Sequence, residues 1–360
     1  MNSSQKTVLV LGAGFTRAFF ADAPLLEDEY DLTLAKFQAL PHAKAILDAE
    51  LNRRPRGSLN IERVMTRLER GMPYDIATQA HEEANLLRGE LMRAFLNRVK
   101  QADGGASHQD DLVQFGGFCV DNRFTCVTFN YDDFFDRALY RSKPTQDMEY
   151  SGPCWIPDTG YGFYCRPSAV CVHDGVISAI REVSMHLLKL HGSVNWRVRS
   201  GSVRPYGFEA VVHHERWSQD PNIMWISMGE DPAYTHDYIE SHLEPDPFVV
   251  APLLGKSELL EQPVLRCVWS RASKELSTAA RVIFLGYSFP VTDLAARFLF
   301  SEAVSSDADI RVVNLTPDDE QKTELKRAYK QVFPELGDDQ FEFQDALKWC
   351  RETVASGRAS

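Results

Sequence analysis

The stretch TVLVLGAGFT, residues 7–16, decides the fold of this chain of 360 residues. Residues 8–11 are a short apolar run that predicts a buried strand, and Gly12-Ala13-Gly14 follows at once. A strand that breaks into a Gly-x-Gly turn and opens a helix is a phosphate-binding device, because its backbone can approach a ligand closely. Arg17 stands where the full pattern has a third glycine, so a strand-to-helix turn without a ligand is the alternative interpretation.

The composition disfavours several classes of function. Lys and Arg number 39 against 51 Asp and Glu, and the net charge of −12 argues against nucleic acid as the main partner. The chain has no run of about 18 apolar residues, and its start, MNSSQK, is unlike a signal peptide, so we expect a cytoplasmic protein without a membrane span. The seven cysteines include no CxxC pair, which predicts reduced thiols and no metal site.

Further apolar runs predict strands that alternate with helices. We expect strands at 124–129, 185–190, 281–285 and 310–313, a strand-like run at 248–254, and helices at 110–120, 134–140, 260–279, 294–300 and 318–331. Thr292 or Asp293 is placed to cap the helix at 294–300, and the tail after about residue 352 is typical of a frayed end. The alternation indicates an α/β fold with a Rossmann-like, doubly wound and mainly parallel sheet.

We interpret residues 1–360 as a single catalytic domain. Residues of about 32–120 indicate a helical insertion, and residues of about 142–180, with four prolines, indicate an irregular loop or lid. Residues 200–245 show no clear pattern. The Rossmann-like core then takes the remaining segments, about 6–31, 122–141 and 183–345.

Five of the expected strands end in small or polar residues. Carboxyl ends of parallel strands meet at one edge of a sheet, where such folds bind ligands, so the set predicts a nucleotide crevice. Each end also has a structural interpretation: Asn130 can cap a helix, His191 can be a core histidine and Tyr287 a core aromatic. The five ends are Gly12-Ala13-Gly14, Asn130-Tyr131-Asp132, His191-Gly192-Ser193, Gly286-Tyr287-Ser288 and Asn314.

Taken together, these motifs resemble a known family, the sirtuin-like domains. The order is GAGFT at 12–16, FNYDD at 129–133, KLHGSVNW at 189–196, FLGYS at 284–288 and VVN at 312–314. The set looks most like the divergent branch of bacterial antiphage defence, whose members hydrolyse NAD. The chain departs from protein-deacylating sirtuins in three ways. It lacks the four-cysteine zinc module, reads AFFADAPLL at 18–26 in place of a Gly-Ile-Pro-x-Phe-Arg run, and has Phe129 where deacylases usually carry glutamine.

The resemblance implies roles for the residues at the strand ends. Asn130 resembles the catalytic asparagine that orients the ribose and the attacking water, and His191 resembles the catalytic histidine that takes a proton. Asp132, by analogy, faces the nicotinamide carboxamide. The other expected NAD contacts are Gly12, Ala13, Gly14, Phe15 and Thr16 for the diphosphate, Gly286, Ser288 and Asn314 for the adenosine half, and Tyr287, Gly192 and Ser193 beside them.

We therefore expect an NAD⁺ hydrolase that releases nicotinamide and ADP-ribose as an abortive-infection antiphage effector. One alternative is an NAD-dependent protein deacylase, which would need a peptide groove and usually zinc. Another is a module that senses NAD or ADP-ribose without turnover, and a dehydrogenase is disfavoured by the missing third glycine. Because an unrestrained NAD hydrolase would kill its own cell, we expect control by homo-oligomerisation or by a separately encoded partner, an ATPase or an argonaute-type protein, contacting residues 32–120.

Overall fold

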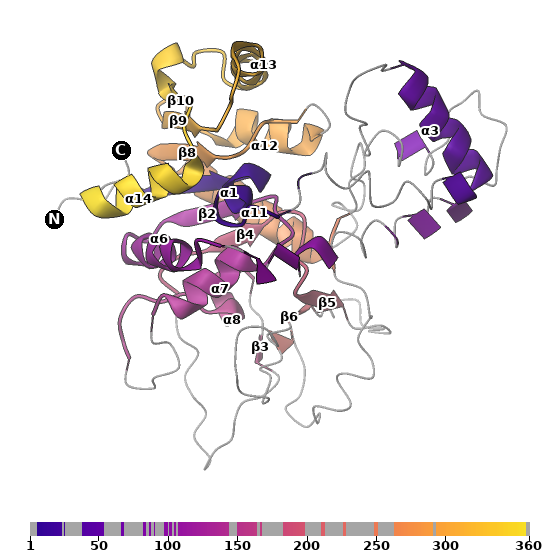
Figure 1. Cartoon of the computed structure of the whole chain (residues 1–360). Helices are drawn as coiled ribbons and strands as arrows, with labels where there is room; N and C mark the ends of the chain where they lie inside the picture. The colour runs from indigo at the N-terminus through magenta and orange to yellow at the C-terminus, as the bar shows by residue number, and fades with distance from the viewer. Residues whose placement is uncertain are drawn as a thin grey trace.

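The computed structural model describes a parallel sheet and the helices that cover it (Figure 1). The described residues are 6–23, 25, 38–53, 107–143, 150–163, 166–167, 183–198, 210–212, 226–227, 248–250, 263–290 and 293–357, with short pieces between residues 66 and 105. The sheet consists of β1 (Thr7–Leu11), β2 (Thr125–Thr128), β4 (Leu187–Lys189), β8 (Arg281–Leu285), β9 (Asp309–Val313) and β10 (Phe341–Glu342). The predicted α/β, Rossmann-like class is confirmed.

The strand order shows that the sheet is doubly wound. Its order is β10-β9-β8-β1-β2-β4, and each neighbouring pair is parallel. The chain therefore starts in the middle of the sheet, moves outward through β2 to β4, and returns to the other side of β1 for β8, β9 and β10. This reversal places a topological switch point between β1 and β8, where open α/β sheets bind ligands.

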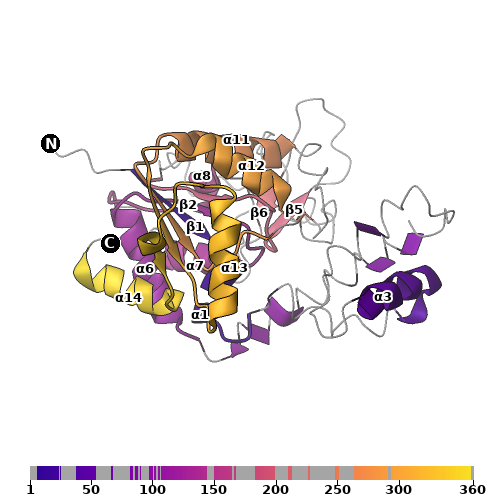
Figure 2. The same ribbon diagram turned by 90° about the horizontal axis from the view of Figure 1, so that it is seen from above.

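The helices form a layer on each face of the sheet (Figures 1 and 2). Right-handed crossovers explain the layers, because the two halves of the sheet are wound in opposite directions. One layer contains α1 (Ala13–Phe19), α6 (Gln109–Asp121), α7 (Phe134–Arg141) and α14 (Ala346–Ser356). The other contains α11 (Pro263–Ser277), α12 (Leu294–Ala303) and α13 (Asp319–Lys330).

Apolar side chains from both halves of the sheet build one core. β1 is wholly buried and β8 is buried from Val282 onward, as their unbroken apolar runs require for central strands. On one face, Phe115 of α6 lies against Phe15 of α1 and Trp349 of α14, with ring centroids 6.1 and 6.3 Å apart. Carboxylate caps begin the last three helices, at Asp293, Asp318 and Asp345.

Further elements lie between these strands and helices in the sequence. They are α3 (Pro41–Arg53), α8 (Pro157–Gly160), the antiparallel pair β3 (Arg166–Pro167) and β7 (Ile226–Ser227), the antiparallel pair β5 (Trp196–Val198) and β6 (Ala210–Val212), and a 3₁₀ turn (Asp338–Gln340). The division of the chain into core, helical insertion and lid stays a prediction. In the described part of the chain, no helix combines the length and apolarity that a bilayer crossing requires.

Two expectations from the sequence differ from the structure, and one strand of the sheet was not expected. The tail after about residue 352 is not frayed, because α14 continues to Ser356 and buries Trp349, Cys350 and Thr353. The run 248–254 forms only an isolated bridge, between Val249 and Gly192, and its residues after 250 lie outside the described part. β10 was not expected, since two residues carry too little pattern to be read as a strand.

Candidate functional site

The carboxyl ends of the parallel strands lie side by side in register. Leu11, the last residue of β1, is paired with Thr128 of β2 on one side and with Leu285 of β8 on the other. Thr128 is in turn paired with Lys189 of β4, and Leu285 with Val313 of β9. The structure therefore brings the five polar strand ends to one edge of the sheet, as the sequence predicted.

The glycine turn after β1 packs directly on the turn after β8. The N–H of Gly12 donates to the carbonyl of Leu285 and that of Gly14 to the carbonyl of Gly286, each at 3.0 Å. A Cβ on Gly12 would lie 2.3 Å from the Gly286 oxygen, and one on Gly286, at φ +62°, would lie 2.1 Å from the nitrogen of Phe15. Close approach of two backbones thus accounts for Gly12, Gly14 and Gly286.

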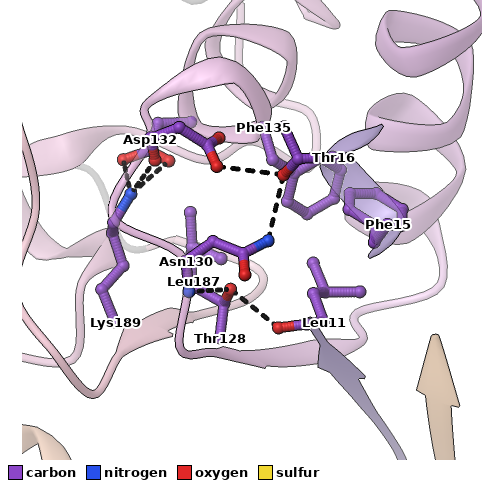
Figure 3. A pocket seen from close by; sticks show the side chains of 10 residues that line it. Leu11, Phe15, Thr16, Thr128, Asn130, Asp132, Phe135, Leu187 and Lys189 are labelled. Carbon is purple, nitrogen blue, oxygen red and sulfur yellow. Dashed lines mark hydrogen bonds and ion pairs between the residues drawn. The ribbon is translucent and has the colours of Figure 1, made fainter. Parts of the chain in front are cut away.

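Asn130, Thr16 and Asp132 form a hydrogen-bonded group beside this turn (Figure 3). Nδ2 of Asn130 donates to the carbonyl of Gly12 at 2.8 Å and to Oγ1 of Thr16 at 3.0 Å. The Thr16 hydroxyl donates to Oδ2 of Asp132 at 3.0 Å, and the N–H of Phe134 donates to Oδ1 of the same carboxyl at 3.2 Å. The structure therefore joins three of the predicted site residues in one network.

This network lines a small pocket at the carboxyl ends of β1, β2 and β4 (Figure 3). Apolar and polar side chains line it from both the strands and the helices. Its lining residues are Leu11, Phe15, Thr16, Thr128, Asn130, Asp132, Phe135, Asp136, Leu187 and Lys189.

Two charged residues of this pocket, Lys189 and Asp136, were not predicted as site residues. The ammonium of Lys189 lies 3.0 and 3.3 Å from the two carboxylate oxygens of Asp136 and donates to the main-chain carbonyl of Asp132. The hydroxyl of Tyr161 donates to the Asp136 carboxylate at 2.6 Å. Burial raises the pKa of Asp136 above its usual range, against the attraction of Lys189. A lysine ending an apolar strand run was the signal that the sequence offered.

Asp132 carries a strongly perturbed carboxyl. Burial raises its pKa from 3.8 to about 6, and the negative charge of Asp136 acts in the same direction. The positive charge of Lys189 opposes the rise in pKa, as do the hydrogen bonds from Thr16 and from the N–H of Phe134. The carboxyl therefore changes charge close to neutral pH, which is a property common among functional groups.

His191 is not among the residues that line this pocket, and its ring lies among aromatic side chains. Its ring centroid is 5.1 Å from that of Phe129 and 6.0 Å from that of Tyr131, and it is buried. Asp293, the N-cap of α12, places Oδ2 3.6 Å from its Nε2. Phe129 and Tyr131 flank Asn130 in the chain and face His191, whereas Asn130 itself faces the glycine turn. The structure therefore gives the two predicted catalytic residues different surroundings.

The remaining predicted contacts lie at the same edge. Gly192, at φ +79°, allows the close approach of Phe248, and the Ser193 hydroxyl donates to Asn195 at 2.5 Å. Tyr287 is buried and stacks on Phe129 with ring centroids 4.8 Å apart, as a core aromatic does. Its carbonyl accepts from the Asn314 amide at 3.1 Å. Ser288 is exposed.

Comparisons with known proteins give low similarity throughout. No family model matches the chain, and no curated protein is significantly similar to it. Among solved structures, it is similar to Sir2Tm bound to a propionylated peptide, at 14% identity over 100% of this chain and 96% of that one, with a TM-score of 0.40. It is also similar to a Sir2 complex with a p53 peptide and NAD⁺, at 15% identity over 99% of this chain and 95% of that one, with a TM-score of 0.39. At these values the likeness supports no statement about activity, and the fold assignment rests on the strand order of the chain itself.

Proposed function

We propose that this chain is an NAD⁺ hydrolase that cleaves the bond between nicotinamide and ribose, giving nicotinamide and ADP-ribose. The observation that carries the proposal is the network of Thr16, Asn130 and Asp132 in a pocket at the carboxyl ends of the parallel strands. Doubly wound sheets bind nucleotides at this edge. The choice of NAD comes from the resemblance of the five strand-end motifs to NAD-hydrolysing sirtuin-like domains.

The reaction needs polar groups around the ribose rather than a strong acid. Nicotinamide leaves as a neutral molecule and takes the electron pair of the broken bond, while water adds to the ribose carbon and loses a proton. Both hydrogen bonds described for the Asn130 side chain use its nitrogen, so Oδ1 is the atom available to accept from a ribose hydroxyl or from the attacking water. Asp132, ionised above about pH 6, supplies negative charge near a cationic nicotinamide ring.

His191 is the base in this proposal, and it takes the proton that the water loses. Its buried position beside Asp293 supports a proton-accepting role, because a neighbouring carboxylate stabilises the imidazolium that results. The adenosine half of NAD would lie toward Gly286, Ser288 and Asn314, at the switch point between β1 and β8. The amides of Gly12, Gly14 and Phe15 donate to carbonyls of the chain itself, so the proposal assigns them no part in holding the diphosphate.

We further propose that the activity serves abortive infection and is restrained until it is needed. Self-assembly or a separately encoded ATPase or argonaute-type partner would release it, with residues 32–120 as the contact surface. The argument is chemical: hydrolysis of NAD in an uninfected cell would remove a cofactor that the cell needs.

The test is a chromatographic assay of nicotinamide release from NAD⁺ over a wide range of protein concentration. We expect release by the wild type, a loss of roughly 10²–10⁴-fold in His191→Ala, and no loss in Lys348→Ala, an exposed position on α14. A steep rise of specific activity with concentration would support control by assembly. NAD-dependent removal of an acyl group from a lysine peptide would favour a deacylase, and calorimetric binding without turnover would favour a sensor. No binding of NAD at any concentration would overturn the proposal.

A further inference from the structure

Five charged side chains are buried together between α7 and the ends of β2 and β4. Three are carboxylates, Asp132, Asp133 and Asp136, and two are cations, Arg137 and Lys189. Each is at most 8% exposed, so water solvates none of them well. Burying a charge costs much free energy unless a partner of opposite charge or a set of hydrogen bonds offsets it. The partners of each charged group therefore show which parts of the chain the cluster holds together.

Lys189 contacts two parts of the chain at once, α7 and the turn that precedes it. Its ammonium pairs with Asp136 on α7 and donates to the main-chain carbonyl of Asp132, which lies in the turn between β2 and α7. Asp136 is itself held by the Tyr161 hydroxyl, which also accepts from Nδ2 of Asn195 at 3.3 Å. Asp133 pairs with Arg137 at 3.7 Å. The ammonium of Lys189 is thus directed at the Asn130–Asp132 turn (Figure 3), and its partner Asp136 is held by Tyr161.

The carboxyl of Asp132 receives its described hydrogen bonds from neutral donors, the Thr16 hydroxyl and the N–H of Phe134. Lys189 and Asp136, which form an ion pair at 3.0 Å, line the same pocket. The pKa of Asp132 is therefore set by burial, by the cation of Lys189, by the neighbouring carboxylate of Asp136 and by these two hydrogen bonds. Thr16 on α1, Phe134 and Asp136 on α7, and Lys189 on β4 are the groups that face it.

We infer that Lys189 is a positioning residue of this pocket: anchored on Asp136, its ammonium fixes the main chain at Asp132 and keeps the Asp132 carboxyl charged. Lys189 acts through Asp132 and through the turn that carries Asn130. Only the identity of the reaction in this pocket rests on the proposed function; the positioning of Asp132 by Lys189 does not. Burial, the largest influence on Asp132, raises its pKa, and Lys189 is the main influence that lowers it.

The test is a carboxyl ¹³C NMR titration of Asp132 in the full chain, with its signal identified by its loss in Asp132→Asn. In Lys189→Met we expect the pKa of Asp132 to rise by about 1 unit or more, because the opposing cation is gone. In Asp136→Asn we expect it to fall, because the neighbouring negative charge is removed and the positive charge of Lys189 remains. The variant with both substitutions should lie between the two. Lys143→Met, at a lysine that pairs with Asp121 away from the pocket, should leave the titration unchanged.

This pattern of opposite shifts separates an electrostatic role from a loss of packing. A Lys189→Met titration that coincides with the wild type overturns the inference. If Lys189→Met does not fold, Asp136→Asn and the double variant decide the matter, and an unchanged or raised pKa of Asp132 in Asp136→Asn overturns it. The titration needs no NAD. Shifts as expected in a protein that neither binds nor hydrolyses NAD would leave the inference standing and reject the proposed function. Where turnover is present, its fall at acid pH should move to higher pH in Lys189→Met.

Discussion

Oδ2 of Asp293 lies 3.6 Å from Nε2 of His191, and both side chains are buried at the edge of the sheet. Asp293 also begins α12, where Oδ1 accepts from the N–H of Ala296 at 3.3 Å. One carboxylate therefore serves both the helix and the proposed base. The two roles can be separated, because asparagine caps a helix as well as aspartate does but carries no charge.

We predict that Asp293→Asn lowers nicotinamide release roughly 10- to 100-fold while the midpoint of thermal unfolding changes little, because only the charge beside His191 is lost. Asp318→Asn is the matched control, since Asp318 caps α13 in the same way, accepting from Gln321 at 2.8 Å. Equal activity of the two variants would show that the pair of Asp293 and His191 has no part in turnover.

Asn130→Ala should lower nicotinamide release by roughly 10²–10³-fold, because the polar group that orients the ribose and water is removed. The fold should survive, since Asn130 is only half-buried. Asn122→Ala provides the comparison: its amide donates to the carbonyl of Phe118 at 2.9 Å, at an exposed helix end. Circular dichroism and turnover measured on both variants check the prediction, and full activity in Asn130→Ala would contradict it.

The pKa of Asp132, raised from 3.8 to about 6, makes stability depend on pH. The folded protein favours the neutral carboxyl. The contribution of this neutral carboxyl to the free energy of unfolding is fully present below about pH 4 and is lost as the pH rises through about 6. The shift corresponds to a cost on the order of 3 kcal/mol at neutral pH. We therefore predict that Asp132→Asn, which removes this cost, is more stable than the wild type at pH 7 and gains little at pH 4, as urea unfolding measures.

Asp338 is a control for that experiment, because its pKa is shifted in the opposite direction. Its hydrogen bonds with Lys330 and Lys326 lower its pKa to about 2. Its contribution to the stability of the folded protein is therefore present at neutral pH and is lost as the pH falls. Asp338→Asn should thus lower stability slightly at pH 7 and not at acid pH. A rise in stability for Asp338→Asn at pH 7 would show that the measurement reports general surface charge.

Gly286→Ala should destabilise the protein by roughly 2–5 kcal/mol, because a left-handed backbone and a clash with the glycine turn add together. Gly357→Ala separates the two effects: Gly357 has φ +68°, close to the +62° of Gly286, and its Cβ would meet nothing within 4 Å. We expect that control to lose about 1–2 kcal/mol from strain alone. Equal losses in urea unfolding would mean that the contact between the two turns contributes nothing.

Trp349→Ala should destabilise the protein by about 3–5 kcal/mol, because its ring is buried against Phe115 of α6. Arg351, two residues on, pairs with Asp111 of α6 at the surface, at 2.7 and 2.8 Å. Arg351→Ala should lose far less, since exposed ion pairs contribute little. Comparable losses from the two substitutions would contradict the packing of α14 in the core.

The sequence predicted the features of the fold that depend on local pattern. β8 matches its expected bounds of 281–285, because a central parallel strand is an unbroken apolar run between turns. α14 was missed because its few buried residues stand among charged and small ones, a composition that is also typical of a frayed chain end. Of the candidate site, Thr16, Asn130 and Asp132 came together as their strand ends implied. The pair of Lys189 and Asp136 could not be read, since the two lie 53 positions apart and meet only through the packing of β4 on α7.

The position of α14 has a consequence for how this molecule is made. The helix contacts α1 and α6, which belong to the first half of the sheet, yet its residues are the last described to leave the ribosome. Until they emerge, the apolar side of α6 around Phe115 stays uncovered, and β8 must already have been inserted beside β1 for the glycine turn to close. A nascent chain of this protein therefore keeps apolar surface around Phe115 exposed until its last described helix docks, although every pocket-lining residue precedes residue 190.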